Sequence, residues 1–203
     1  MREHLRPALS LLVLFSLLCG IAYPLAVTGL AQLIFPRQAA GSLASKDGQV
    51  IGSWLVGQNF SQPGYFHGRP SAAGANGNDA SASSGSNLGP TSKALQERIA
   101  TTLTTLKAEN PNAAIPADLV YASGSGLDPQ ISPAAARFQI PRVAAARGVS
   151  AEALERLINE HSQPRLLGVL GEPVVNLLAL NYALDAQSPL PSAPTTALSE
   201  GSR

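Results

Sequence analysis

The longest uncharged stretch of the sequence limits most strongly what this chain can fold into. From Ala8 to Phe35 no residue carries a charge, and Leu, Ala, Val, Ile and Phe predominate. A helix rises about 1.5 Å per residue, so about 20 residues cross the roughly 30 Å hydrocarbon core of a bilayer. The stretch is longer than that. We therefore predict a transmembrane helix over residues 8–35, preceded by a tail of residues 1–7.

Three residues interrupt this stretch, Gly20, Pro24 and Gly29. Proline removes a backbone hydrogen bond, but membrane helices tolerate such positions when neighbouring helices pack against them. The pattern therefore favours a partner helix in the membrane.

A cleaved signal peptide and a lipoprotein signal at Cys19 are the alternatives. Signal peptides have an apolar region of only about 7–15 residues that ends in a small-x-small site. Leu18 stands before Cys19, where a lipoprotein signal has a small residue. The length of the stretch favours the uncleaved anchor.

The orientation of the anchor is predicted from the charges that flank it. Arg2 and Arg6 precede the apolar stretch, and positive charge is retained on the cytoplasmic side. A long domain after the anchor is translocated largely regardless of its own charge. We expect a cytoplasmic N-terminus and an extracytoplasmic domain over residues 36–186.

The pattern after the anchor is typical of a small α+β domain. Gln49–Ile51 and Trp54–Val56 are short apolar runs that predict strands, whereas residues 71–90 are rich in Ser, Ala, Gly and Asn and predict a surface loop. About four helices are expected. The first follows a cap at Thr91 or Ser92 and has Leu95, Ile99, Leu103 and Leu106 at helical spacing. The second begins at Ser132-Pro133 and is ended or kinked by Pro141, the third is capped by Ser150, and the fourth is opened by Pro173 and runs from Val174 to about Leu184. Residues 187–203 are predicted to be disordered.

Composition argues against several classes of function. Only 13% of residues are charged and the net charge is +1, so no basic stripe is available for nucleic acid. Cys19 is the only cysteine, and His4, His67 and His161 do not have the spacing of a zinc site. No lysine follows the glycines of a Walker loop. We predict no catalytic residues, no metal site and no tightly bound cofactor.

Two segments have more specific side chains than packing requires. Tyr65, Phe66, His67 and Arg69 lie close together in the sequence and suit a loop that binds a partner. The alternative is a turn whose arginine pairs with a local carboxylate.

The second segment runs through Ser123, Gly124, Ser125 and Gly126 towards the helix that Ser132 should cap. Free amides before a helix can form an anion site, and the alternative is a flexible loop before a capped helix. A membrane-anchored extracytoplasmic hydrolase using Ser125 and His67 is a further alternative.

Five stretches of the chain resemble the C subunit (KdpC) of the bacterial Kdp high-affinity potassium-transporting P-type ATPase. One departure is the single Gly85 where the family often has two glycines before Ser86. The stretches follow the family's order: Arg6–Leu9; Gly52-Ser53 through Gly57–Phe60; Tyr65–Ala72; Ser125–Pro129 with Ile131–Pro133 and Gln139–Val143; and Gly171–Asp185.

This resemblance implies an accessory, non-catalytic subunit of an ATP-driven potassium-uptake complex in the bacterial inner (plasma) membrane. The implied partners are a channel-like potassium-translocating subunit, an ATP-hydrolysing P-type subunit and a small hydrophobic subunit. The family is described as a catalytic chaperone that raises the ATP affinity of the hydrolysing subunit.

The resemblance also implies an ATP-binding stretch, in which Ser123–Gly126 and Gln139 are likened to the signature loop of ABC transporters. An extracytoplasmic domain cannot touch a cytoplasmic nucleotide. We therefore expect ATP to be bound through the hydrolysing subunit, and any effect on its affinity to be transmitted through the anchor.

Overall fold

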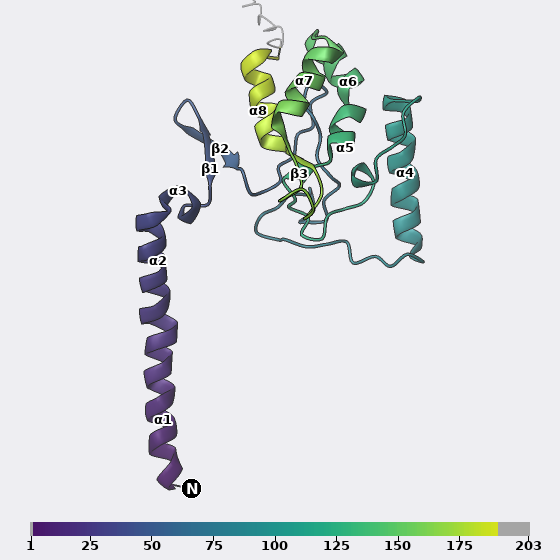
Figure 1. The fold of residues 1–203 in the computed structure, drawn as a ribbon. Helices are drawn as coiled ribbons and strands as arrows, with labels where there is room; N and C mark the ends of the chain where they lie inside the picture. The colour runs from purple at the N-terminus through teal and green to yellow at the C-terminus, as the bar shows by residue number, and fades with distance from the viewer. Residues whose placement is uncertain (1, 191–203) are drawn as a thin grey trace, which may run out of the picture. The chain divides into compact units, whose positions relative to one another are not determined.

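The computed structural model describes residues 2–190 of the chain. The chain divides into two compact units, one ending at Ser53 and the other beginning at Trp54. Figure 1 shows the helices and strands of both units.

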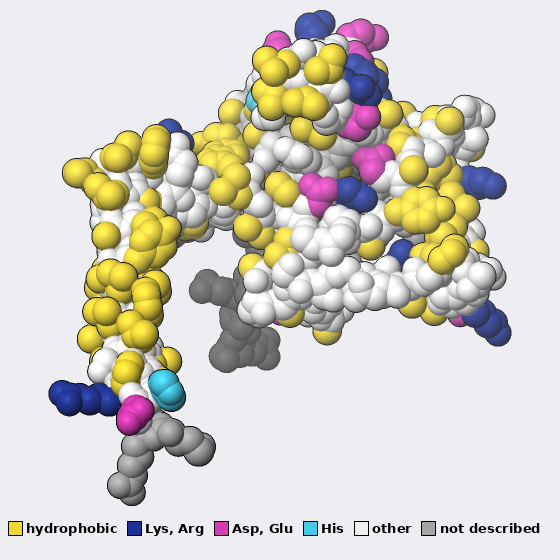
Figure 2. Space-filling view, turned by 60° about the horizontal axis from the view of Figure 1, so that its bottom comes forward, with side chains coloured by type: hydrophobic (Ala, Val, Ile, Leu, Met, Phe, Trp, Pro, Cys, Tyr) yellow, Lys and Arg dark blue, Asp and Glu magenta, His cyan; other side chains and the backbone are white. Residues whose placement is uncertain are grey.

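A long apolar helix forms most of the first unit. It consists of α1 (Arg2–Leu17), a π-helical turn (Leu18–Ala22) and α2 (Tyr23–Ile34). Pro24 has no N–H to donate and its ring crowds the carbonyl four residues before it, so the wider π turn directly before it accommodates the proline. Hydrophobic side chains cover the visible face of this helix (Figure 2). Residues Glu3–Ile34 are long and apolar enough to cross a membrane, and none of the most apolar window is buried.

A short helix and a hairpin complete the first unit. Helix α3 (Pro36–Ala39) is followed by β1 (Leu43–Lys46) and β2 (Gln49–Ser53), which pair antiparallel. Asp47 and Gly48 form the two-residue turn with φ of 51° and 79°. Positive φ at both positions gives the turn whose twist matches an antiparallel hairpin.

The second unit contains five α-helices and one 3-10 turn among its described residues. Ser132, Ser150 and Asn176 each accept a hydrogen bond from a backbone N–H of the helix that they cap. The helices are α4 (Lys93–Glu109), η2 (Ala117–Leu119, 3-10), α5 (Pro133–Phe138), α6 (Ile140–Arg147), α7 (Ala151–His161) and α8 (Leu177–Gln187).

Three very short strands form an antiparallel sheet beside these helices. They are β3 (Gln130–Ile131), β4 (Ser162–Gln163) and β5 (Val174–Asn176), in the order β3-β5-β4. Helices α5, α7 and α8 pack around one core with the central strand. Its largest fully buried apolar side chains are Phe66, Ile131, Val143, Leu154, Leu157, Ile158, Val175, Leu180 and Leu184.

The predicted α+β class, with an N-terminal apolar helix before short strands and helices, is confirmed. Helix α4 begins after Ser92, although the Ser92 side chain accepts no capping hydrogen bond. Pro141 stops one helix as predicted, because α5 ends at Phe138 and the proline lies in the first turn of α6.

Two predicted elements were wrong in kind. Trp54–Val56 forms a turn, and the Trp54 carbonyl accepts a hydrogen bond from the Asn176 amide at 2.7 Å. Val174–Asn176 is a strand rather than the first turn of a helix, because its backbone pairs with both neighbouring strands. Asn176 then caps α8 at Leu177, so the cap outweighed Pro173 as the helix start.

The serine- and glycine-rich loop, residues 71–90, has no regular secondary structure, as predicted. It is nevertheless fixed at Ser71, whose hydroxyl accepts from the N–H groups of Ala73 and Asn78. The predicted disorder of residues 187–203 was wrong at Gln187, which is the last residue of α8. Residues 191–203 lie outside the described residues.

Candidate functional site

The segment Pro63–His67, here called the clamped segment, has no strand or helix but is fixed by side chains from α6, from α8 and from Gln139, the residue between α5 and α6. Arg142 Nη1 donates to the carbonyls of Pro63 at 2.5 Å and Tyr65 at 2.8 Å. Arg147 Nε donates to the Gly64 carbonyl at 2.6 Å. Both arginines lie on α6, so one helix holds three successive carbonyls.

Two buried amides hold the next two residues of the clamped segment. Phe66 N–H donates to Asn181 Oδ1 at 2.9 Å, and Asn181 Nδ2 returns a hydrogen bond to the Phe66 carbonyl at 2.9 Å. The Gln139 amide binds His67 by the same pair of hydrogen bonds: Oε1 accepts from the His67 N–H at 2.7 Å, and Nε2 donates to the His67 carbonyl at 3.0 Å. Each amide replaces the strand partner that this buried backbone lacks.

Gln139 has no hydrogen-bonding capacity left for a ligand in this conformation. Besides its two bonds to His67, its Oε1 accepts from Arg142 Nη2 at 2.6 Å and its Nε2 donates to the Ala135 carbonyl at 3.2 Å. A glutamine amide offers two donors and two lone pairs, and all four are used. The side chain is also buried, with the residue 1% exposed. Its predicted part in nucleotide binding stays a prediction, and its observed contacts are structural.

Tyr65 belongs to a charged cluster with Arg147 and Asp185. The Arg147 guanidinium lies over the Tyr65 ring, 4.7 Å from its centroid, and donates to Asp185 Oδ1 at 2.8 Å. Tyr65 OH donates to the other oxygen of that carboxylate at 2.9 Å. Burial, and then the Asp185 carboxylate, raise the pKa of Tyr65 above its usual value. The phenol therefore keeps its proton and its bond to α8.

Burial lowers the pKa of His67, and the nearby Arg142 guanidinium lowers it further. The imidazole is therefore held in its neutral form. Its Nε2 lies 3.2 Å from the Gln62 carbonyl, a contact that acts in the opposite direction.

The four side chains predicted to bind a partner have different environments. Phe66 is 0% exposed and belongs to the core, whereas Tyr65, His67 and Arg69 are half-buried. Arg69 pairs with Asp128 at 2.8 Å, which agrees with the alternative of a paired arginine. A partner-binding role stays a prediction, and only the three half-buried residues present surface for it.

The second predicted segment, Ser123–Gly126, lies against the loop of residues 71–85. The Ser125 carbonyl accepts from Ser84 N–H at 2.9 Å and from Ser83 Oγ at 3.0 Å. At Gly126 (φ 68°), an added Cβ would lie 2.6 Å from the Ser84 carbonyl oxygen. Ser123 and Gly126 are buried, and Gly124 and Ser125 are exposed. The structure therefore joins this segment to a loop of the same chain rather than to Gln139.

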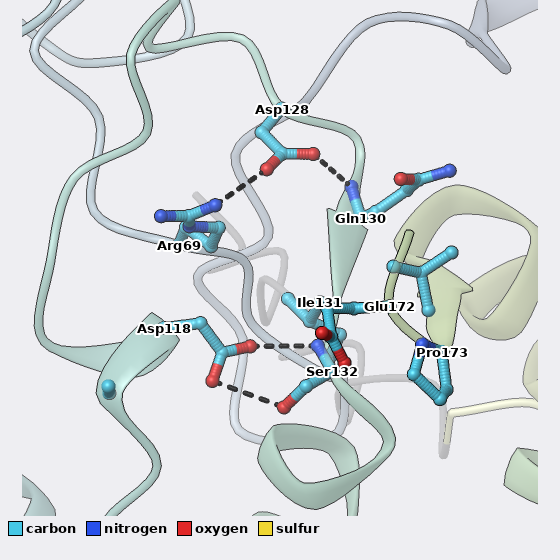
Figure 3. Close-up of a pocket in the computed structure, with 10 residues that line it drawn as sticks. Arg69, Asp118, Asp128, Gln130, Ile131, Ser132, Glu172 and Pro173 are labelled. Atoms are coloured by element: carbon cyan, nitrogen blue, oxygen red, sulfur yellow. Dashed lines mark hydrogen bonds and ion pairs between the residues drawn. The ribbon is translucent and has the colours of Figure 1, made fainter. Parts of the chain in front are cut away.

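A cavity of about 330 Å³ lies beside the N-terminus of α5. Three carboxylates line it, and each already has a partner. Figure 3 shows that Asp118 accepts from Ser132 N–H and Oγ, and that Asp128 accepts from Arg69 and from Gln130 N–H. Glu172 pairs with Arg165 at 2.6 Å. The negative charge that a helix N-terminus favours is thus supplied by Asp118. The anion site predicted near Ser132 is occupied by a carboxylate of the same chain.

The geometry shows no nucleophile joined to a base at the residues proposed for hydrolysis. Ser125 Oγ accepts from Leu127 N–H, and the His67 ring contacts the Gln62 carbonyl. Among residues 2–190, no group of three His, Cys, Asp or Glu side chains is placed to share a metal ion.

Sequence reasoning missed the residues that organise the clamped segment. Asn181, Arg142 and Arg147 carry most of its hydrogen bonds, and none was singled out. A usable signal was present for Asn181, because it directly follows the four apolar residues Leu177–Leu180 that begin α8, where a buried amide needs a partner.

Comparisons with known proteins assign the family. The family model described as "KdpC: K+-transporting ATPase, c chain" matches residues 5–186. A "Potassium-transporting ATPase KdpC subunit" of Rhodopseudomonas palustris is 57% identical over 197 residues, covering 92% of this chain and 98% of the relative. One of Caulobacter vibrioides is 62% identical over 190 residues, covering 93% and 96%. One of Bradyrhizobium diazoefficiens is 57% identical over 196 residues, covering 91% and 98%. The chain therefore belongs to the KdpC family of potassium-transporting ATPase subunits.

Proposed function

We propose that this chain is a membrane-anchored, non-catalytic subunit that supports assembly and coupling of an ATP-driven potassium-uptake complex. Its apolar helix packs in the bacterial inner membrane, and its second unit works on the extracytoplasmic side. Its partners are a channel-like translocating subunit, an ATP-hydrolysing subunit and a small hydrophobic subunit.

The observation that carries this proposal is the state of the helix Glu3–Ile34, whose most apolar window has no buried residue within the chain. Apolar side chains on this scale need a surrounding that the described residues do not provide, and a bilayer with neighbouring helices supplies one. The π turn at Leu18–Ala22 adds a local irregularity of a kind that packing against neighbouring helices supports.

The hydrogen bonds of the second unit support a structural role over a chemical one. Gln139 is occupied by His67, Ala135 and Arg142, and Ser125 is joined to the neighbouring loop. An increase in the ATP affinity of the hydrolysing subunit would then be a coupling between distant sites, transmitted through the anchor helix.

Cysteine accessibility tests the orientation. In a Cys19→Ser background, Gly89→Cys places a thiol on an exposed loop position where an added Cβ meets no atom within 4 Å. His4→Cys, before the apolar stretch, is the matched control on the other side of the anchor. Intact cells with a permeabilised outer membrane are treated with a membrane-impermeant thiol reagent.

We expect labelling of Gly89→Cys in intact cells, and of His4→Cys only after lysis. The reverse pattern would place the second unit in the cytoplasm and would make direct help with ATP binding the better account.

Direct nucleotide binding is tested on the purified full-length chain in detergent with millimolar ATP. We expect no saturable binding. If binding does saturate, Ser125→Ala is the informative variant, because Ser125 is exposed whereas Gln139→Ala would also disturb the buried clamped segment.

A further inference from the structure

The residues directly after α8, Ser188–Leu190, lie against the clamped segment and are here called the strap. The Ser188 N–H caps α8 by donating to the Leu184 carbonyl at 2.9 Å. The Ser188 carbonyl accepts from Arg147 Nη1 at 2.5 Å. Leu190, the last described residue, is half-buried. The chain therefore stays bound to the second unit beyond the end of its last helix.

Gly64 of the clamped segment has no space for a side chain because of the strap. An added Cβ at Gly64 would collide with Leu190 Cδ2, and it would lie 3.4 Å from Leu190 Cγ and 3.5 Å from Arg147 Cγ. Gly64 is not among the glycines with a positive φ, so its backbone conformation alone would accept an alanine. The close approach of Leu190 is therefore what requires glycine at this position.

One buried guanidinium joins the strap to the clamped segment. The Arg147 side chain is 0% exposed. Besides its bond to the strap, it donates to the Gly64 carbonyl through Nε and to Asp185 through Nη2, and it covers the Tyr65 ring. When the strap leaves, a donor of this buried cation loses its acceptor, which is unfavourable. Gly64 and Tyr65 are thus fixed most firmly when the strap is bound.

The strap is held less firmly than the second half of the clamped segment. Phe66 and His67 each exchange two hydrogen bonds with a buried amide, and Phe66 lies in the core. The strap pairs with no strand among residues 2–190, and Pro189 has no N–H to donate. Segments with few backbone hydrogen bonds and partial exposure open at a lower free-energy cost than the core around them. The strap should therefore open while the core stays folded.

From these contacts we infer that the strap is a conformational latch on Tyr65. When closed, it fixes Gly64 and Tyr65 against α6 and α8. When open, it releases these two residues while Phe66 and His67 stay in place. Tyr65 is one of the side chains predicted to bind a partner, so the latch controls how rigidly that side chain is presented. The family model ends at residue 186, and the strap lies beyond it. The latch lies within the second unit and does not depend on the proposed function.

Hydrogen exchange of the purified full-length chain in detergent, resolved to single residues by fragmentation mass spectrometry, tests the latch. The Tyr65 N–H donates to the Gln62 carbonyl at 3.1 Å and reports on the half of the clamped segment that is released. The Phe66 N–H reports on the half that stays. In Leu190→Ala, which removes the atoms nearest Gly64, we expect the Tyr65 amide to exchange about tenfold faster. The Phe66 amide and the amides of α7 should exchange as in the wild type.

A double-mutant cycle with Gly64→Ala shows whether Gly64 and Leu190 meet. Alone, Gly64→Ala pushes Leu190 away, and the Tyr65 amide should again exchange about tenfold faster. In Gly64→Ala/Leu190→Ala the new methyl group occupies space that the leucine has left, so exchange should be no faster than in Leu190→Ala. The matched controls, which should exchange like wild type, are Gly89→Ala, at an exposed glycine where an added Cβ meets no atom within 4 Å, and Leu55→Ala, at a leucine that is 63% exposed.

Faster exchange confined to Tyr65, together with a non-additive double variant, supports the latch. Wild-type exchange at Tyr65 in Leu190→Ala, or the same rise in either control, would overturn it. Additive effects in the double variant would show that Leu190 and Gly64 do not meet and would overturn it as well. An equal rise at Tyr65, at Phe66 and in α7 would show that the whole unit is destabilised and that no local latch exists.

Discussion

The long helix and the unit beginning at Trp54 use polar residues in opposite ways. Between Ala8 and Phe35 no side chain is charged, and within residues 2–190 the most apolar window of the helix has no buried residue. The second unit buries Gln139, Asn181 and Arg147 in its interior. The helix therefore depends on its surroundings for stability, whereas the second unit depends on hydrogen bonds that fix an irregular segment inside it.

The largest effect expected in the second unit comes from Arg147→Met. The Arg147 side chain is 0% exposed and donates to Gly64, Ser188 and Asp185. Its removal leaves buried acceptors and a carboxylate without their partner, and we expect the free energy of unfolding to fall by about 4 kcal/mol.

Arg137→Met is the matched control, measured alongside by denaturant titration. Arg137 pairs with Glu155 at 2.6 Å, but both side chains are about two-fifths exposed. Such a pair contributes less than about 1 kcal/mol. Similar losses in the two variants would contradict the view that the clamped segment is held by buried charge.

A charge in the middle of the long helix tests whether the helix depends on a membrane around it. Ile21→Arg should weaken membrane insertion by about 3 kcal/mol and lower the fraction of the chain retained in alkali-washed membranes. The unfolding midpoint of the second unit should not move. Ile21→Ala keeps the stretch uncharged and should be retained like wild type. Full retention of Ile21→Arg would argue against a spanning helix.

Asn181→Leu is a smaller change to the interior of the second unit. The substitution keeps the volume but leaves the N–H and the carbonyl of Phe66 buried without partners. We expect a loss of about 2 kcal/mol in the free energy of unfolding. Asn159→Leu, at an exposed position of α7, should change it little. A neutral Asn181→Leu would show that Phe66 is fixed by packing alone.

The smallest effect is a dependence of stability on pH that comes from His67. Its pKa is lowered in the folded chain by burial and then by Arg142, so below the usual pKa of about 6.5 the unfolded chain binds a proton that the folded chain resists. The stabilisation is fully present above that pH and is lost as pH falls towards the folded pKa.

Chemical denaturation at several pH values between 5 and 8 measures this dependence. The slope of the free energy of unfolding against pH should be positive below 6.5 in the wild type and smaller in His67→Gln. Equal slopes in the two proteins would remove His67 as the cause.

Local signals predicted the elements that depend on local chemistry. The uncharged stretch predicted the N-terminal helix, and Ser132, Ser150 and the spacing of Leu95 to Leu106 predicted the starts or faces of α5, α7 and α4. The same reasoning failed at Val174–Asn176. A strand of three residues exists only because β3 and β4 lie on either side of it, and no periodicity that short reveals its neighbours.

The roles of the candidate-site residues were harder to predict, because they depend on contacts with residues distant in the sequence. The sequence alone marked Tyr65–Arg69 and Ser123–Gly126 as unusual, since side-chain type and glycine content are visible in any chain. Only the tertiary structure showed that Phe66 and His67 are held by residues far along the chain, Asn181 of α8 and Gln139 between α5 and α6. The sequence does not distinguish an exposed glutamine from a buried one. Burial decides whether such an amide can bind a ligand or must satisfy the backbone beside it.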